Sequence, residues 1–124
     1  MRQDKILIVG DQPVKLEMMK DSLDRDGYET VTASHGEEAL QLTNQTFDLL
    51  LADIVIPHMG GLEPIRAFRE LSPTTVPMLI TGHASVETAQ AALEHGVCDY
   101  IIKPFDRHKL CTAVAKALKR NRSV

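Results

Sequence analysis

Short aliphatic runs alternate along this chain with longer segments in which apolar residues recur at helical spacing. The runs predict strands, because they are short, apolar and often β-branched. Apolar residues three or four positions apart predict amphipathic helices between them. The expected strands cover residues 5–10, 28–33, 47–53, 76–81 and 98–103. The expected helices cover residues 12–26, 36–44, 62–68, 86–93 and 110–118.

This strict alternation predicts an α/β fold. Neighbouring parallel strands need a crossover connection, and each predicted helix supplies one. The strands are almost continuously aliphatic, as expected for a sheet covered by helices on both faces. We therefore expect a three-layer sandwich with a five-stranded parallel sheet and five helices, forming a single domain over residues 1–124.

Composition and charge narrow the classes of function. No apolar run approaches the roughly 20 residues of a membrane span, and the first residues lack a signal-peptide pattern, so we expect a cytoplasmic protein without a membrane partner. The net charge of −3 argues against direct nucleic-acid binding. Cys98 and Cys111 fit neither a zinc spacing nor a disulfide framework, which predicts reduced structural thiols.

Polar residues follow several of the predicted strands. Asp11 comes after the first strand and Gly10, and Asp53, Thr81 and Lys103 end the third, fourth and fifth strands. Ligands of open α/β sheets bind at the carboxyl ends of the strands, so these side chains are expected on one rim. Taken singly, each has a structural explanation: a helix cap for the acids, strand propensity for the threonine, a solvated end for the lysine.

Taken together, these four side chains make a set suited to phosphoryl transfer. Carboxylate oxygens suit Mg²⁺, which prefers few protein ligands. A lysine offers a compact charge for phosphoryl oxygens, and a hydroxyl can donate one hydrogen bond. An aspartate can also act as a nucleophile that accepts a phosphoryl group as an acyl phosphate.

Four segments give the chain a family resemblance. They are "KILIVGDQ" (5–12), "DLLLADIVIPHMGGLE" (48–63), "MLITGHA" (78–84) and "DYIIKPF" (99–105). In this order and spacing the chain resembles the receiver domain of two-component response regulators, the CheY-like family, over essentially its whole length. The resemblance implies a flavodoxin-like sheet with the strand order 2-1-3-4-5.

The resemblance also implies roles for individual residues. Asp53 would be the phosphoacceptor, Lys103 the phosphate-binding lysine, Thr81 the switch hydroxyl and Tyr100 the switch aromatic, with a cis peptide between Lys103 and Pro104. Without the resemblance, Tyr100 reads as a half-buried aromatic on an edge strand. The phosphoryl donor would be a histidine kinase or phosphotransfer protein. The domain would be no enzyme beyond promoting its own phosphorylation and dephosphorylation.

Phosphorylation of a receiver would reshape the surface formed by the fourth helix, the fifth strand and the fifth helix. That surface would contact an output domain or a second copy of the chain. Val55 and His83 lie two residues beyond Asp53 and Thr81, and the resemblance implies that side chains at these positions tune the loss of the phosphoryl group. Val55 orients no water, which predicts moderately slow loss, whereas His83 is either a solvated loop residue or a contributor to turnover.

Gly10 departs from the family pattern, which has two adjacent acids after the first strand. The resemblance then leaves a Mg²⁺ site made of Asp11, Asp53 and the backbone carbonyl of Val55. Because the missing acid generally orients metal-bound water, we expect roughly tenfold weaker Mg²⁺ binding. The alternative is a degenerate receiver that acts as a phosphorylation-independent interaction module.

Two other classes of α/β protein, the flavodoxins and the aspartate-based phosphohydrolases, fit the residues of this chain poorly. A flavodoxin needs a hydroxyl-rich phosphate loop after the first strand, and "GDQPVK" does not supply one. An aspartate-based phosphohydrolase needs a second acid two residues after its nucleophile, and that position holds Val55. The fold alone could not have excluded either class.

Overall fold

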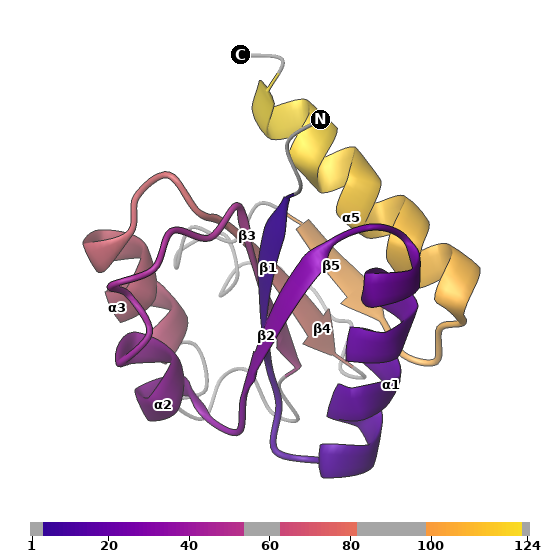
Figure 1. The fold of residues 1–124 in the computed structure, drawn as a ribbon, viewed down its shortest axis with the longest axis horizontal. Helices are drawn as coiled ribbons and strands as arrows, with labels where there is room; N and C mark the ends of the chain where they lie inside the picture. Colours follow the sequence, from indigo (N-terminus) through magenta and orange to yellow (C-terminus); the bar gives the residue numbers. More distant parts are fainter. Residues whose placement is uncertain (1–3, 54–62, 82–98, 123–124) are drawn as a thin grey trace.

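A computed structural model describes residues 4–53, 63–81 and 99–122 of the chain (Figure 1). In these ranges strands and helices alternate as expected from the first strand to the fourth, and the last helix follows the fifth strand. The strands are β1 (Lys5–Val9), β2 (Glu29–Ala33), β3 (Leu49–Asp53), β4 (Val76–Thr81) and β5 (Asp99–Ile102). The helices are α1 (Pro13–Arg25), α2 (Gly36–Leu40), α3 (Glu63–Leu71) and α5 (Arg107–Arg122). The expected helix at 86–93 lies outside the described residues.

The five strands form one parallel sheet in the order β2-β1-β3-β4-β5, which confirms the predicted topology. The register places Val9 beside Ala52, Asp53 beside Ile80, and Thr81 beside Ile102. Strands β1, β3, β4 and β5 therefore finish at one edge of the sheet. This edge is the rim on which the candidate residues were expected.

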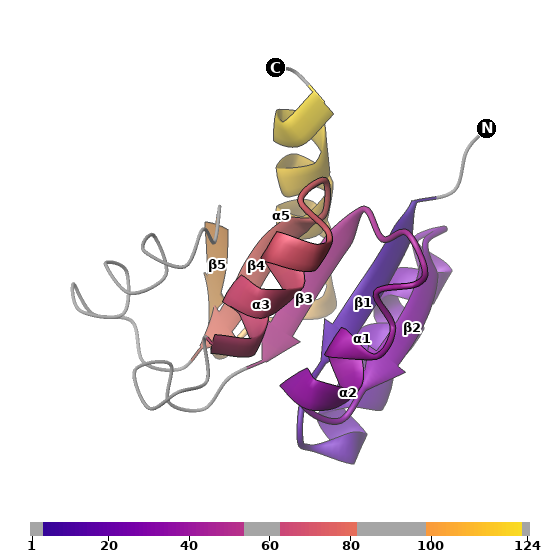
Figure 2. The same ribbon diagram turned by 90° about the vertical axis from the view of Figure 1, so that its left-hand side faces the viewer.

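Helices cover the sheet on both faces (Figures 1 and 2). Helices α1 and α5 lie on one face, and α2 and α3 lie on the other. Side chains alternate along each strand, so Leu49 and Leu51 join the core under α1 and α5, whereas Leu50 and Ala52 join the core under α2 and α3. Because β3 is packed from both sides, it is a rigid carrier for the residue at its end.

Helix α1 begins and ends where the local chemistry indicates. Pro13 occupies its first position, where a missing N–H costs nothing, and Gln12 precedes it without a side-chain cap. The helix ends at Arg25, and Asp26 and Gly27 follow it. Gly27 adopts a φ of +96°, which a residue with a side chain rarely adopts. A helix cap was the alternative explanation for Asp11, and it is wrong because Gln12 occupies the N-cap position.

Helix α2 is shorter than expected, because it ends at Leu40 instead of residue 44. The chain continues in turns, with the Leu42 N–H donating to Ala39 and the Gln45 N–H donating to Leu42, both at 3.0 Å. The Thr43 hydroxyl donates to the Leu40 carbonyl at 3.0 Å. A β-branched hydroxyl residue that competes for backbone carbonyls favours such an early end.

Cys111 carries a free thiol on α5. Burial raises the pKa of this thiol, and the negative charge of Asp26 raises it further. The thiol donates weakly to the Ser22 carbonyl at 3.8 Å. These contacts fit the reduced, structural thiol expected from the sequence, and Cys98 lies outside the described residues.

None of the helices within residues 4–53, 63–81 and 99–122 combines the length and the apolar character needed to cross a membrane.

Candidate functional site

Three of the predicted site residues lie at the ends of adjacent strands. Asp53 is the last residue of β3, Thr81 is the last residue of β4, and Lys103 directly follows β5. The register of the three strands places them next to one another on the rim. The Lys103–Pro104 peptide is cis, as the family resemblance implied.

Asp53 and Lys103 form an ion pair. Lys103 Nζ lies 2.6 Å from Asp53 Oδ1, so the lysine is not the solvated strand end that was its alternative explanation. The Asp53 side chain is only 8% exposed and that of Lys103 is 22% exposed. Despite the short distance, Oδ1 has no hydrogen bond of good geometry within the described residues. The contact is an ion pair between a nearly buried carboxylate and a half-buried ammonium group.

Gly10 lies directly beside Asp53. A Cβ atom at position 10 would lie 3.4 Å from Asp53 Cβ and 3.6 Å from Leu16 Cδ1, which are ordinary contact distances. An acidic side chain at position 10 would therefore start next to the candidate nucleophile. Asp11 follows and is exposed, so the rim offers one exposed and one nearly buried carboxylate from neighbouring strands.

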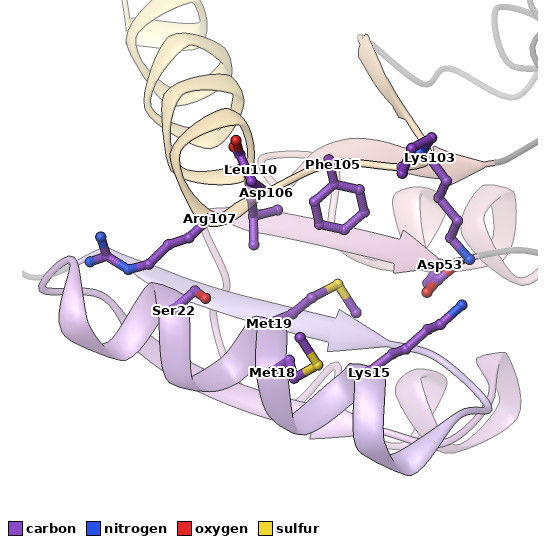
Figure 3. A pocket seen from close by; sticks show the side chains of 11 residues that line it. Lys15, Met18, Met19, Ser22, Asp53, Lys103, Phe105, Asp106, Arg107 and Leu110 are labelled. Carbon is purple, nitrogen blue, oxygen red and sulfur yellow. Dashed lines mark ion pairs between the residues drawn. The ribbon is translucent and has the colours of Figure 1, made fainter.

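A pocket of about 380 Å³ opens beside Asp53, between α1 and the start of α5 (Figure 3). Its walls combine apolar and cationic side chains. The apolar wall includes Met18, Met19, Phe105 and Leu110, and Lys15 and Lys103 lie at the end near Asp53. The pocket is large enough to hold a phosphoryl group and part of the group that donates it.

Sequence reasoning missed the residues that α1 contributes to this pocket. Lys15, Met18, Met19 and Ser22 recur at helical spacing on one side of the helix. Lys15 carried a usable signal, since a cation in the first helical turn opposes the helix dipole. The methionines gave no such signal, because an apolar stripe at this spacing is usual for a helix packed on a sheet.

Some predicted residues are placed only in part. Thr81 and Tyr100 have defined positions in β4 and β5, but their side chains are outside what the structure describes. Val55 and His83 lie outside the described residues altogether. The proposed roles of these four residues therefore stay predictions.

The donor atoms on the rim fit a hard divalent cation. Asp53 supplies a buried oxygen without a hydrogen bond, and Asp11 supplies a second carboxylate on the neighbouring loop. Within the described residues, no group of three or more His, Cys, Asp or Glu side chains is arranged to hold a metal. Two carboxylates suit Mg²⁺, which keeps several waters and often binds through one or two acids plus phosphate oxygens.

Comparison with known proteins is consistent with this geometry. Residues 6–115 match the sequence profile of the response regulator receiver domain. A crystal structure of a CheY-like response regulator receiver domain protein from Methanospirillum hungatei superposes with a TM-score of 0.89, at 32% identity, and the match covers 98% of each chain.

Longer regulatory proteins match as well. The transcriptional regulatory protein CpxR of Escherichia coli is 34% identical over 118 residues, which cover 95% of this chain and 50% of CpxR. The regulatory protein AtoC of the same organism is 38% identical over 117 residues, which cover 94% of this chain and 25% of AtoC. The chain thus spans between a quarter and half of these relatives. It belongs to the response regulator receiver domain family of two-component signalling.

Proposed function

We propose that this receiver accepts a phosphoryl group on Asp53 from a phosphohistidine, with Mg²⁺ as the cofactor. The observation that carries the proposal is Oδ1 of Asp53, a buried carboxylate oxygen that lies against a lysine and has no hydrogen bond within the described residues. A nearly buried carboxylate that is held at the end of a strand by one ion pair, beside an open pocket, is well placed to act on a ligand in that pocket.

The chemistry follows from the residues on the rim. A carboxylate oxygen of Asp53 attacks the phosphorus in line, the P–O bond forms as the P–N bond breaks, and the imidazole nitrogen keeps the electron pair of that bond. Lys103 lies close enough to move from the Asp53 carboxylate to an oxygen of the transferred group. Its charge then offsets the negative charge that gathers on the phosphoryl oxygens.

Asp11, Asp53 and the backbone carbonyl of Val55 are the groups that would hold Mg²⁺. When bound, the ion supplies positive charge to the phosphoryl oxygens and helps to align them. The chain contributes the acidic oxygens, the lysine and the pocket. It would act as a promoter of its own phosphorylation and dephosphorylation, not as an enzyme on a separate substrate.

The switch would run through β4 and β5. Thr81 ends the strand next to Asp53, and its hydroxyl is proposed to donate to a phosphoryl oxygen. Tyr100 lies beside Leu79 in the neighbouring strand and is proposed to follow. Contacts that exist only with the phosphoryl group would then shift the population between two packings of this region.

The proposed partners are a histidine kinase or phosphotransfer protein as donor, and an output domain or a second copy of the chain as receiver of the signal. The much greater length of CpxR and AtoC supports an output domain. Ile102 supports a contact at the β5 edge, since this apolar side chain is 39% exposed there. A cytoplasmic location is part of the same proposal, because that is where such a donor would be met.

A second candidate function is a receiver that binds partners without phosphorylation. Gly10 favours it, because the position beside Asp53 that could hold a further acid carries no side chain. Under this alternative the Asp53–Lys103 pair would be purely structural.

The test is NMR spectroscopy of the domain with Mg²⁺, before and after addition of beryllofluoride, a phosphoryl mimic. The chain contains no tryptophan, so amide shifts replace fluorescence quenching as the readout. We expect Mg²⁺-dependent shifts at Asp53, Thr81, Tyr100 and Lys103. The variant Asp53→Asn is the matched control and should show none of them. A wild-type spectrum unchanged by beryllofluoride at saturating Mg²⁺ would favour the interaction module instead.

A further inference from the structure

Lys15 brings a second ammonium group to the phosphoryl site. It is the third residue of α1 and lines the same pocket as Asp53 and Lys103. Figure 3 shows its side chain rising from α1 with the nitrogen directed toward Asp53, on the opposite side from Lys103. A group bound on Asp53 would therefore lie between two lysines.

The surroundings of Lys15 separate it from the other cations of α1. Lys20 pairs with Asp24 at 3.0 Å, and Arg25 pairs with Asp21 at 3.3 Å. Within the described residues, Lys15 has neither a hydrogen bond nor an ion pair. Its position is also unfavourable for a cation, because the N-terminal turn of a helix carries partial positive charge. Lys15 is exposed, and its ammonium group pairs with no other described residue, so it is able to contact an anion in the pocket.

The charges on the rim give Lys15 a function. Gly10 contributes no carboxylate, so the end of the pocket near Asp53 combines this one acid with two ammonium groups, Lys15 and Lys103. Asp11 follows Gly10 outside the pocket lining, and Asp106 and Arg107 line the pocket at the start of α5. Such a site attracts a divalent cation less strongly than one with a further acid, and it attracts an anion more strongly.

We propose, building on the phosphorylation of Asp53, that Lys15 is a second cation for the phosphoryl oxygens. Its charge supplies part of the neutralisation for which the site would otherwise depend on Mg²⁺. Lys15 and Gly10 are then complementary, since the glycine weakens Mg²⁺ binding and the lysine lowers the need for it.

The experiment compares the affinity for beryllofluoride, by NMR titration, at saturating Mg²⁺ and at a low, subsaturating Mg²⁺ concentration. The variant Lys15→Met keeps the length of the side chain and removes its charge, and Lys15→Arg restores the charge. Lys116→Met is the matched control, because Lys116 is an exposed lysine of α5 outside the pocket.

We expect Lys15→Met to lower the affinity about three- to tenfold, as for one exposed charge near an anion, with the larger loss at low Mg²⁺. Lys15→Arg and Lys116→Met should bind as the wild type does. Mg²⁺ alone should bind more tightly to Lys15→Met, because a like charge has been removed.

Two results would overturn the inference, and they are distinguishable. If the wild type binds beryllofluoride and Lys15→Met binds it equally well under both conditions, Lys15 has no part in the site and the proposed function stands. If the wild type binds no beryllofluoride even at saturating Mg²⁺, the proposed function fails and this inference fails with it.

Discussion

The two ends of the central strands carry similar residues in contrasting environments. At the amino end, Lys5 begins β1 and Asp48 directly precedes the neighbouring strand β3, and the backbone N–H of Lys5 donates to Asp48 Oδ2 at 2.8 Å. Lys5 Nζ donates to Gln45 at 2.6 Å, pairs with Glu29 at 3.5 Å and lies 5.2 Å from the centre of the Phe47 ring. At the carboxyl end, Lys103 contacts an Asp53 oxygen that has no hydrogen bond within the described residues.

This contrast distinguishes a structural lysine–aspartate set from a functional one. The groups at the amino end are hydrogen-bonded to one another and tie β1, β2 and the start of β3 together. The groups at the carboxyl end form a single ion pair that lies beside a pocket. Residue type alone would not separate the two sets, because both contain a lysine and an aspartate near the ends of strands. Their partners do separate them.

Exchanging each lysine for methionine should give the largest difference between the two ends. Lys103→Met removes the cation beside the acceptor, so we expect the affinity for beryllofluoride to fall by about 10²-fold, the usual cost of losing a preorganised charge-stabilising group. Lys5→Met should leave this affinity unchanged and lower the free energy of unfolding by about 1 kcal/mol, because one charged hydrogen bond is lost. NMR titration and urea unfolding measure the two quantities.

Removing each aspartate should again affect stability more at the amino end. Asp48→Ala leaves the Lys5 N–H without its acceptor, and we expect a loss of about 2 kcal/mol in the free energy of unfolding. Asp53→Ala removes one ion pair at the edge of the pocket, where the Lys103 ammonium can turn to solvent, so we expect a loss below about 1 kcal/mol. Urea unfolding of the two variants side by side decides this. A larger loss for Asp53→Ala would mean that its pair with Lys103 is structural.

Adding an acid at the carboxyl end should sharpen the contrast further. The variant Gly10→Asp places a third carboxylate beside Asp53, where the space for a Cβ is adequate. We expect Mg²⁺ to bind about tenfold more tightly, since groups that orient metal-bound water commonly contribute this much. A Mg²⁺ titration followed by NMR gives the affinity, with Ala115→Asp, at an exposed position of α5, as the control for the added charge. Equal affinities for wild type and Gly10→Asp would contradict the inferred cost of the glycine.

The smallest expected effect concerns the hydrogen-bonded side chains of Lys20, Asp24 and Thr30, which lie away from both ends of the central strands. The Thr30 hydroxyl donates to Asp24, which lowers the pKa of this carboxyl, and Lys20 lowers it further. A lowered pKa means that Asp24 stabilises the fold above the pKa of the unfolded chain and loses this effect on acidification. Since Asp24 is largely exposed, Asp24→Asn should cost less than about 1 kcal/mol at neutral pH.

The difference between wild type and Asp24→Asn should shrink as the pH falls below about 4, where the carboxyl takes up a proton. Thermal unfolding across this range measures it. A difference that grows on acidification would show that the carboxyl is not stabilised as its contacts indicate.

The sequence predicted the sheet well because its strands are short aliphatic runs ended by polar residues or glycine. The register that brings Asp53, Thr81 and Lys103 together follows from the strand order, which came from the family resemblance. Helix α2 was predicted too long, because periodicity does not show that Thr43 binds the Leu40 carbonyl. Lys15 was missed, because its role depends on which way α1 faces across the sheet.

The environment of Asp53 could not be predicted from the sequence either. "LLADIVIP" shows an acid after an aliphatic run, but not that one of its oxygens is buried without a hydrogen bond. Hydrogen-bond geometry depends on side-chain positions from several strands. It becomes visible only once those strands are assembled.

The methionines in the pocket wall give this protein its own spectroscopic probes. The chain has 5 methionines, at positions 1, 18, 19, 59 and 78. Met18 and Met19 line the pocket next to Asp53, while Met78 is fully buried in the sheet. Selective ¹³C labelling of methionine methyl groups would thus yield a spectrum simple enough to assign by single substitutions. Two of its signals would report directly on pocket occupancy, and the Met78 signal would serve as an internal reference for the intact core.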